Sequence, residues 1–246
     1  MTKKQTYIGI AIIVLIFGFI SVKNIIKRVN EGDVVRGEVA AIDKVDNSAE
    51  SGELSYITIN GKDRKVPEFK LIDQNNDTIT DKSYRGKVFL VEFFFTRCPD
   101  ICIPMSKNLI EIQNEFADRE DFGIASISID PEYDTPEVLK KYAAAYGAVH
   151  PNWHYLTGDR ETIYDLSNIG FNINAQANPN LEASFTHSGL FALVDQNGFI
   201  RSRLDDFGNP LVYYRGNIPR GEVKDGQEDP QIDILITDIK KLLKQD

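Results

Sequence analysis

A nearly unbroken apolar run, residues 88–95 (VFLVEFFF), leads directly into the only two cysteines of the chain. A run of this kind is typical of a central strand in a parallel sheet, which is buried on both faces. Beyond Cys98 the apolar residues recur with helical spacing, at Ile101, Met105, Leu109, Ile112 and Phe116. The sequence therefore predicts a buried strand that runs straight into a helix, with the cysteines at the junction.

The cysteine pair, Cys98 and Cys102, is the first candidate for chemistry. Unpaired backbone N–H groups and the dipole at a helix N-terminus favour a thiolate there. Residues four apart share one face of a helix, so both sulfurs are expected on the same side. Two such thiols can bind one soft metal ion or close on each other as a disulfide. A pair of inert core thiols is disfavoured by the position at a strand-to-helix junction.

The rest of the chain alternates predicted strands with predicted helices. Apolar runs bounded by turn residues predict strands at residues 66–72, 88–95, 123–129, 153–157 and 190–194. Capping residues and periodicity predict helices that start at or near Cys98, at residues 134–137 and at Asp159. A last amphipathic helix, expected to pack on the sheet, has an apolar face made of Ile232, Leu235, Ile236, Ile239, Leu242 and Leu243. This alternation indicates an α/β core with parallel pairing.

Residues 66–204 resemble the Sco/SenC family of thioredoxin-like, membrane-anchored copper proteins. The resemblance rests on five stretches in the family's order: VPEFKLIDQN, GKVFLVEFFFTRCPDIC, SISIDPEYDTPEVLKKYA, WHYLTGD and FTHSGLFALVDQNG. It implies an α/β, thioredoxin-like fold with a central mixed sheet flanked by helices. It also implies that the bound metal is copper, as Cu(I) or Cu(II), with Cys98, Cys102 and His187 at the positions of the family's ligands.

Two residues depart from the family's pattern. Ile103 intervenes between the second cysteine and Pro104, and Thr186 precedes the histidine where the family often has Asp. The first departure shifts the point at which the helix is expected to bend, and the second removes an orienting carboxylate. Neither removes a ligand.

The three histidines are unequal candidates for a metal site. His187 directly precedes the strand predicted at residues 190–194. By resemblance to thioredoxin-like folds, its loop packs beside the cysteine helix and its imidazole faces the two sulfurs. Imidazole and two thiolates form a three-coordinate site suited to Cu(I). His150 and His154 are four apart, but Pro151 breaks helical geometry between them, so we expect surface or packing roles.

Hydropathy predicts the domain organisation. Residues 1–6 form a short tail, and residues 7–26 begin with an apolar or small stretch (YIGIAIIVLIFGFISV) that predicts a transmembrane anchor. A cleaved signal peptide is the alternative, which the lack of an A-x-A-like site disfavours. Residues 27–64 predict a juxtamembrane spacer, and residues 65–246 a thioredoxin-like copper-binding domain with a polar inserted loop at 201–231.

The charge distribution and the composition of the N-terminal leader limit the expected partners and the cellular location of the protein. The net charge is −9; all 37 Asp and Glu follow residue 30, whereas five of the 28 Lys and Arg precede it. So acidic a domain argues against nucleic acid as a partner. The leader is not rich in Arg and Ser, which favours a bacterial membrane over a mitochondrion. The resemblance, rather than the charge, implies a single pass through the cytoplasmic (inner) membrane with the soluble domain on the extracytoplasmic side.

The resemblance implies a metallochaperone that delivers copper to, or helps assemble, the CuA centre in subunit II of cytochrome c oxidase. Other periplasmic copper or thiol-redox proteins are further expected partners. The alternative is an enzyme, a thiol–disulfide oxidoreductase that keeps partner cysteines reduced. In it, Cys98 is the attacking thiolate and Cys102 the resolving thiol. The C-x-x-x-C spacing departs from the C-x-x-C of thioredoxins. A peroxidase is disfavoured because Thr96 lies two residues before Cys98, where peroxiredoxins have Thr at three.

Overall fold

The computed structural model describes Lys23 and residues 54–59, 61–173, 175–177, 185–204, 210–221 and 229–244, without the side chains of 59, 175–177, 185–187 and 210. The chain divides into two compact units, Met1–Ala41 and Ile42–Asp246, and the second contains both cysteines and every strand described below. The predicted tail and anchor lie outside the described residues, except for Lys23. Among the described residues, no helix has both the length and the apolar character needed to cross a bilayer.

Within the described residues, ten strands form a mixed central sheet. All seven residues of β6 (Val88–Phe94) are buried; β6 pairs in parallel with β7 (Phe122–Ser128) and antiparallel with β11 (Leu190–Val194). This confirms the predicted central strand, which is covered on both faces. The main path of the sheet runs β1 (Ser55–Tyr56), β12 (Ile200–Leu204), β11, β6, β7, β8 (Trp153–Thr157), β4 (Lys70–Asp73) and β5 (Thr78–Thr80).

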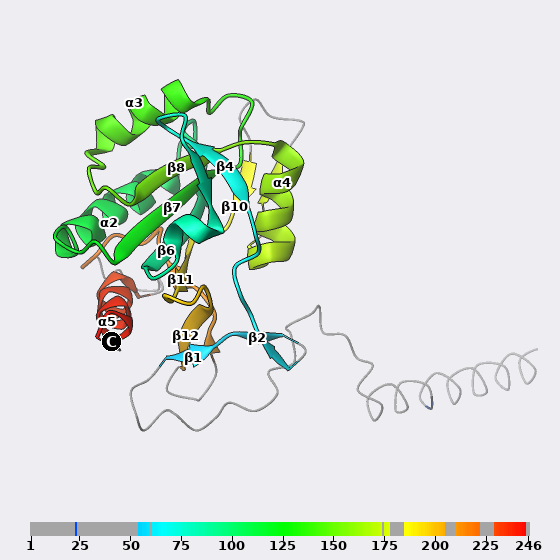
Figure 1. The fold of residues 1–246 in the computed structure, drawn as a ribbon, viewed down its shortest axis with the longest axis vertical. Helices are drawn as coiled ribbons and strands as arrows, with labels where there is room; N and C mark the ends of the chain where they lie inside the picture. Colours follow the sequence, from blue (N-terminus) through cyan, green and yellow to red (C-terminus); the bar gives the residue numbers. More distant parts are fainter. Residues whose placement is uncertain are drawn as a thin grey trace, which may run out of the picture. The chain divides into compact units, whose positions relative to one another are not determined.

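Helices lie on both sides of these strands (Figure 1). They are η2 (Asp81–Tyr84), α2 (Cys102–Glu115), α3 (Pro136–Tyr146), α4 (Arg160–Asp165), its π-helical continuation η3 (Leu166–Phe171), and α5 (Ile232–Leu242). The ring of Phe94 in β6 packs against Tyr142 of α3 with a centroid distance of 5.4 Å. The ring of Phe93 packs against Phe171 of η3 at 5.7 Å. Because successive strand residues point to opposite faces, α3 and η3 cover opposite sides of β6.

The ends of these helices follow the predicted capping signals. Thr135 is the N-cap of α3, where its side chain accepts a first-turn backbone N–H, and Pro136 takes the first helical position. Gly147 ends the helix in the left-handed conformation, with φ of 81°. Asp159 caps α4 in the same way as Thr135 caps α3. The predicted apolar face of α5 is also buried, and α5 contacts α2 and the short strand β14 (Tyr214–Arg215).

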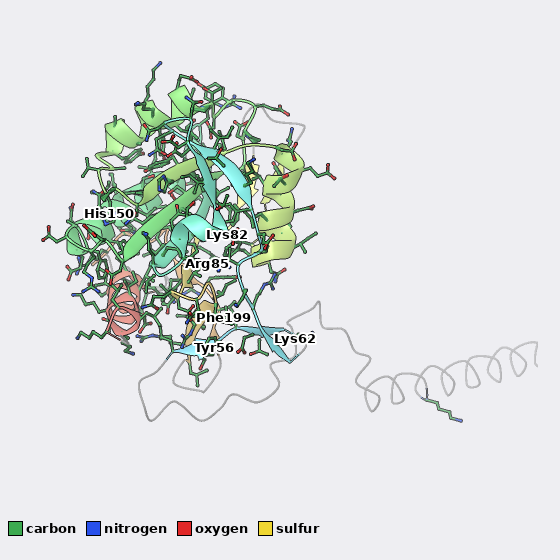
Figure 2. All side chains as sticks on the ribbon, in the orientation of Figure 1. Tyr56, Lys62, Lys82, Arg85, His150 and Phe199 are labelled. Atoms are coloured by element: carbon green, nitrogen blue, oxygen red, sulfur yellow. The ribbon has the colours of Figure 1, made fainter. Side chains whose placement is uncertain are left out.

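The folded domain begins before residue 65, where the sequence predicted its start. β1 pairs antiparallel with β12, and the ring of Tyr56 meets that of Phe199 edge-on at 5.3 Å (Figure 2). β2 (Thr58–Ile59) and β3 (Lys62–Asp63) then pair antiparallel with each other. This stretch therefore belongs to the domain and not to the predicted spacer, whereas the other predicted bounds stay predictions.

The expectation of an inserted loop at residues 201–231 is wrong at residues 201–204, 210–211 and 214–215, which form strands. β13 (Pro210–Leu211) pairs with β12, and β14 (Tyr214–Arg215) pairs with β11. Tyr214 is fully buried, and its hydroxyl donates to Oδ2 of Asp238 in α5 at 2.9 Å. Strands of two residues carry no period-2 pattern, so the Gly and Pro residues of this stretch indicated a loop.

Candidate metal centre

The two cysteines lie beyond the end of β6, but the helix begins later than predicted. α2 starts at Cys102, and Cys98 lies in the turn before it. The expectation that both sulfurs share a helix face is therefore wrong. Pro99 disfavours a helical conformation for the residue before it, which is Cys98. Cys102 is only 1% exposed, whereas Cys98 is partly exposed.

The turn nevertheless brings the two sulfur atoms together. Both cysteines are reduced, and their thiols share a hydrogen bond. This bond, and then burial, raise the pKa of Cys102 far above its ordinary value, while a backbone hydrogen bond with Phe95 opposes them. Cys102 is therefore a neutral thiol in the metal-free protein. Its proton must leave before the sulfur can act as a thiolate ligand or nucleophile.

Asp134 holds the start of the cysteine turn. Its carboxylate accepts the backbone N–H of Thr96 at 3.0 Å, as well as the hydroxyls of Thr96 and Ser128. Asp134 is fully buried, and burial raises its pKa although these hydrogen bonds act in the opposite direction. The pattern of residues 134–137 indicates a helix start but not this role, because Thr135 does the capping and the partners of Asp134 lie on other elements.

A second restraint comes from Arg97, which directly precedes Cys98. Its Nε donates to Oδ2 of Asp130 at 3.1 Å, and its guanidinium lies 4.1 Å from the ring centroid of Tyr133. Asp130 and Tyr133 belong to the same loop after β7 as Asp134. The loop after β7 therefore fixes the cysteine turn at two successive residues.

A buried polar cluster lies beneath the cysteines. Glu92 of β6 is 2% exposed; Ser126 donates to its Oε1 at 2.6 Å, and Trp153 Nε1 donates to the Ser126 hydroxyl at 3.0 Å. Among the described residues, Glu92 Oε2 and the hydroxyl of Tyr155 have no hydrogen-bond partner. Burial raises the pKa of Glu92 to about 7. The carboxyl is also close enough to raise the pKa of Cys102. Glu92 was visible in the sequence as the charged residue of the apolar run.

The structure describes the backbone of His187 but not its imidazole. β10 (Phe185–His187) pairs with β9 (Ala175–Ala177), and β11 follows closely. Ala192 of β11 lies opposite Val91 of the antiparallel β6, so the start of β11 lies beside the end of β6. The segment that carries His187 (β10 and the residues that join it to β11), called the His187 loop below, therefore lies at the same end of β6 and β11 as the cysteine turn. Among the described side chains, no three His, Cys, Asp or Glu groups gather as a metal site, and the role of His187 stays a prediction.

The other two histidines are hydrogen-bonded within the protein. His150, labelled in Figure 2, is buried; its Nε2 lies 3.2 Å from the carbonyl oxygen of Arg119, and its Nδ1 accepts the N–H of Asn152 at 3.2 Å. Burial lowers the pKa of His150. His154 Nδ1 lies 2.9 Å from Oδ2 of Asp73. His150 lies in a turn and His154 in β8, so they do not share a helix face.

A comparison of the chain with models of known protein families identifies its family. The model of the family described as SCO1/SenC matches residues 58–215, which is more than half of the chain and includes both cysteines and His187. The chain belongs to the SCO1/SenC family.

Individual proteins similar to this chain support the assignment. The SCO1 protein homolog of Bacillus subtilis is 34% identical over 136 residues, which are 54% of this chain and 70% of that protein. A Stutzerimonas stutzeri protein named "Putative copper-binding protein" is 32% identical over 149 residues, 58% of this chain and 70% of that protein. The solved structure of BsSco, described as a cytochrome c oxidase assembly protein of the Sco family with a disulfide switch, is 28% identical. It has a TM-score of 0.59 and covers 74% of this chain and 95% of its own. The thioredoxin-like α/β fold with a mixed sheet is thereby confirmed.

The departure from the SCO1/SenC pattern after the second cysteine leaves the helix start intact. Pro104 takes the third position of α2, where a backbone N–H has no partner within the helix. The proline ring therefore costs α2 no hydrogen bond. The intervening residue, Ile103, is 40% exposed and points away from the core.

Proposed function

We propose that this protein binds one copper ion through Cys98, Cys102 and His187 and delivers it to, or helps assemble, the CuA centre in subunit II of cytochrome c oxidase. The observation that carries the proposal is the pair of contacting thiols at the end of β6 and β11 where the His187 loop also lies. A family relative named for copper binding and another described as an oxidase assembly protein support it.

The residues present fit copper. Two sulfurs that lie in hydrogen-bond contact can both reach one ion, and thiolates are the soft donors that Cu(I) prefers. Cys98 is partly exposed, so an incoming ion or a partner protein can reach the pair from solvent. An imidazole from the His187 loop would complete a three-coordinate site, and Cu(II) would need additional ligands.

The test is copper retention by the full chain in detergent, measured by metal analysis after competition with a Cu(I) chelator. We expect about one copper per chain in the reduced protein and much less after oxidation of the dithiol, because a disulfide cannot supply two thiolates. The loaded protein is expected to transfer its copper to a metal-free CuA domain of oxidase subunit II. Equal retention by the oxidised and reduced forms would contradict the proposal.

We further propose that residues 7–26 anchor the protein in the bacterial cytoplasmic membrane, with residues 1–6 on one side and the soluble domain on the extracytoplasmic side. The apolar stretch at residues 7–22 supports this placement. The full chain is expected to remain with the membrane fraction in alkaline carbonate, whereas a chain that starts at residue 27 is released. Release of the full chain by carbonate would argue against an anchor.

A thiol–disulfide oxidoreductase is the second candidate function, and the hydrogen bond between the thiols favours it. The more exposed Cys98 would attack a disulfide of the partner, and Cys102 would then displace the partner's thiolate and leave an intramolecular disulfide. The two functions differ in their need for His187. A His187→Ala variant that exchanges disulfides at the wild-type rate but retains no copper would show both activities in one site.

A further inference from the structure

Asn108 is a buried amide on the same helix as Cys102. It is 1% exposed, and its Nδ2 donates to the carbonyl oxygens of Gly216 and Ile218, each at 2.8 Å. Its Oδ1 accepts the backbone N–H of Arg220 at 3.2 Å. One side chain thus holds three backbone groups of the segment that follows β14.

This segment in turn holds the backbone that follows His187. The N–H of Gly216 donates to the carbonyl oxygen of Gly189 at 2.7 Å, and β14 pairs with the first residues of β11. The approach is close enough to require glycine on both sides. A Cβ on Gly189 would lie 2.6 Å from Cβ of Asn217, and one on Gly216 would lie 2.4 Å from the ring of Phe191.

We propose that Asn108 is a positioning residue that sets the placement of the His187 loop relative to the cysteine helix. The path runs from α2 through Asn108 to Gly216, and from Gly216 to Gly189, two residues after His187. The inference rests on the proposed copper function. It adds to that function the residue that links the cysteine helix to the His187 loop. It also gives the 214–221 segment a role, as a brace between α2 and β11.

The chemistry of the contact explains why an amide is needed. Two carbonyl oxygens require two donors, and one N–H requires an acceptor, so the carboxamide matches all three groups at once. An aspartate of the same shape lacks both donors, and a leucine lacks all three functions. Arg220 adds a second link, since its guanidinium pairs with Asp233 of α5 at 2.6 Å and with Glu111 of α2 at 3.5 Å.

Gln113 supplies a matched control on the same helix. It is also a buried amide, at 3% exposed, and it also holds three backbone groups: it donates to the carbonyl oxygen of Gly147 at 3.1 Å and accepts the N–H of Val149 and of His150. These groups lie in the loop between α3 and β8, which does not carry His187. Loss of Gln113 therefore disturbs α2 to a similar degree and leaves the contacts between Asn108 and the 214–221 segment in place.

The experiment compares Cu(I) affinities of the full, reduced chain by competition with chelators of graded strength. Asn108→Ala is expected to lower the affinity about tenfold or more, the usual effect of losing a residue that supports a ligand. In a His187→Ala background the same change should have no further effect, and Gln113→Ala should leave the affinity within about twofold. An equal loss from Asn108→Ala in both backgrounds, or an equal loss from Gln113→Ala, would overturn the inference, as would an unchanged affinity.

Amide hydrogen exchange separates this inference from the copper function. Asn108→Ala should speed exchange of the Gly216 amide far more than Gln113→Ala does, and Asn108→Ser, which keeps one donor, should lie between wild type and alanine. If the wild type retains no copper, the proposed function fails while the exchange result still decides whether the brace exists. Equal Gly216 exchange in the Asn108 and Gln113 variants would overturn the brace itself.

Discussion

Cys98→Ser, Cys102→Ser and His187→Ala are each expected to weaken Cu(I) binding so far that the reduced chain no longer retains one copper against a strong chelator, although weaker chelators still allow the affinity to be measured. A serine hydroxyl is a hard donor that stays protonated at neutral pH, so neither serine replaces a thiolate on Cu(I). Loss of a residue that merely supports a ligand costs about 10- to 100-fold in affinity, so we expect at least about 100-fold for a ligand. Metal analysis after chelator competition measures the loss.

His154→Ala is the matched control for the ligand series, because His154 pairs with Asp73 on β4, a strand four places from β11 in the sheet. It should retain as much copper as the wild type. Undiminished copper in all three ligand variants would refute the proposed site. Loss in both cysteine variants with retention in His187→Ala would remove His187 alone from the ligand set.

Glu92→Gln is expected to remove a large pH dependence from the free energy of unfolding. Well below pH 4.5 the carboxyl is neutral in both folded and unfolded chains and makes no difference. As the pH rises, the unfolded chain ionises near its ordinary pKa of 4.5, while the buried carboxyl keeps its proton up to about 7. The wild type therefore loses stability across this window. The difference between the two pKa values corresponds to about 3 kcal/mol.

The measurement is chemical denaturation of both proteins at pH 4.5 and pH 8. Other groups that titrate in this range affect both proteins alike, so the change in their difference isolates Glu92. The glutamine keeps an oxygen that accepts the hydrogen bond from Ser126, which limits the packing cost. A difference that stays constant between the two pH values would show that Glu92 ionises at its ordinary pKa in the folded protein.

The strand and helix at the centre of the fold were predictable because their signals are local. The apolar run of β6 and the spacing of Met105, Leu109 and Ile112 in α2 each determine a buried surface without reference to other segments. Capping residues located α3 and α4 for the same reason. The two-residue strands β13 and β14 have no such signal, because their stability comes from pairing with β12 and β11.

The construction of the cysteine turn was less accessible from the sequence than the candidate residues themselves. The cysteines stood out by spacing and position, and the family resemblance added His187, whose role stays a prediction. The start of α2 was misplaced, because Pro99 is compatible both with a first helical turn and with the tight turn that forms. The restraint by Asp134 and the brace through Asn108 join segments far apart in sequence, and a single sequence gives no direct sign of such pairs.

The pairing of β6 with β11 limits which parts of the domain can move when a metal ion is loaded or released. Backbone hydrogen bonds between two buried, neighbouring strands fix the points from which the cysteine turn and the His187 loop depart. Such strands open only when the whole domain unfolds. Loading and release of an ion would then involve only the cysteine turn, the His187 loop and their side chains, while β6 and β11 remain paired.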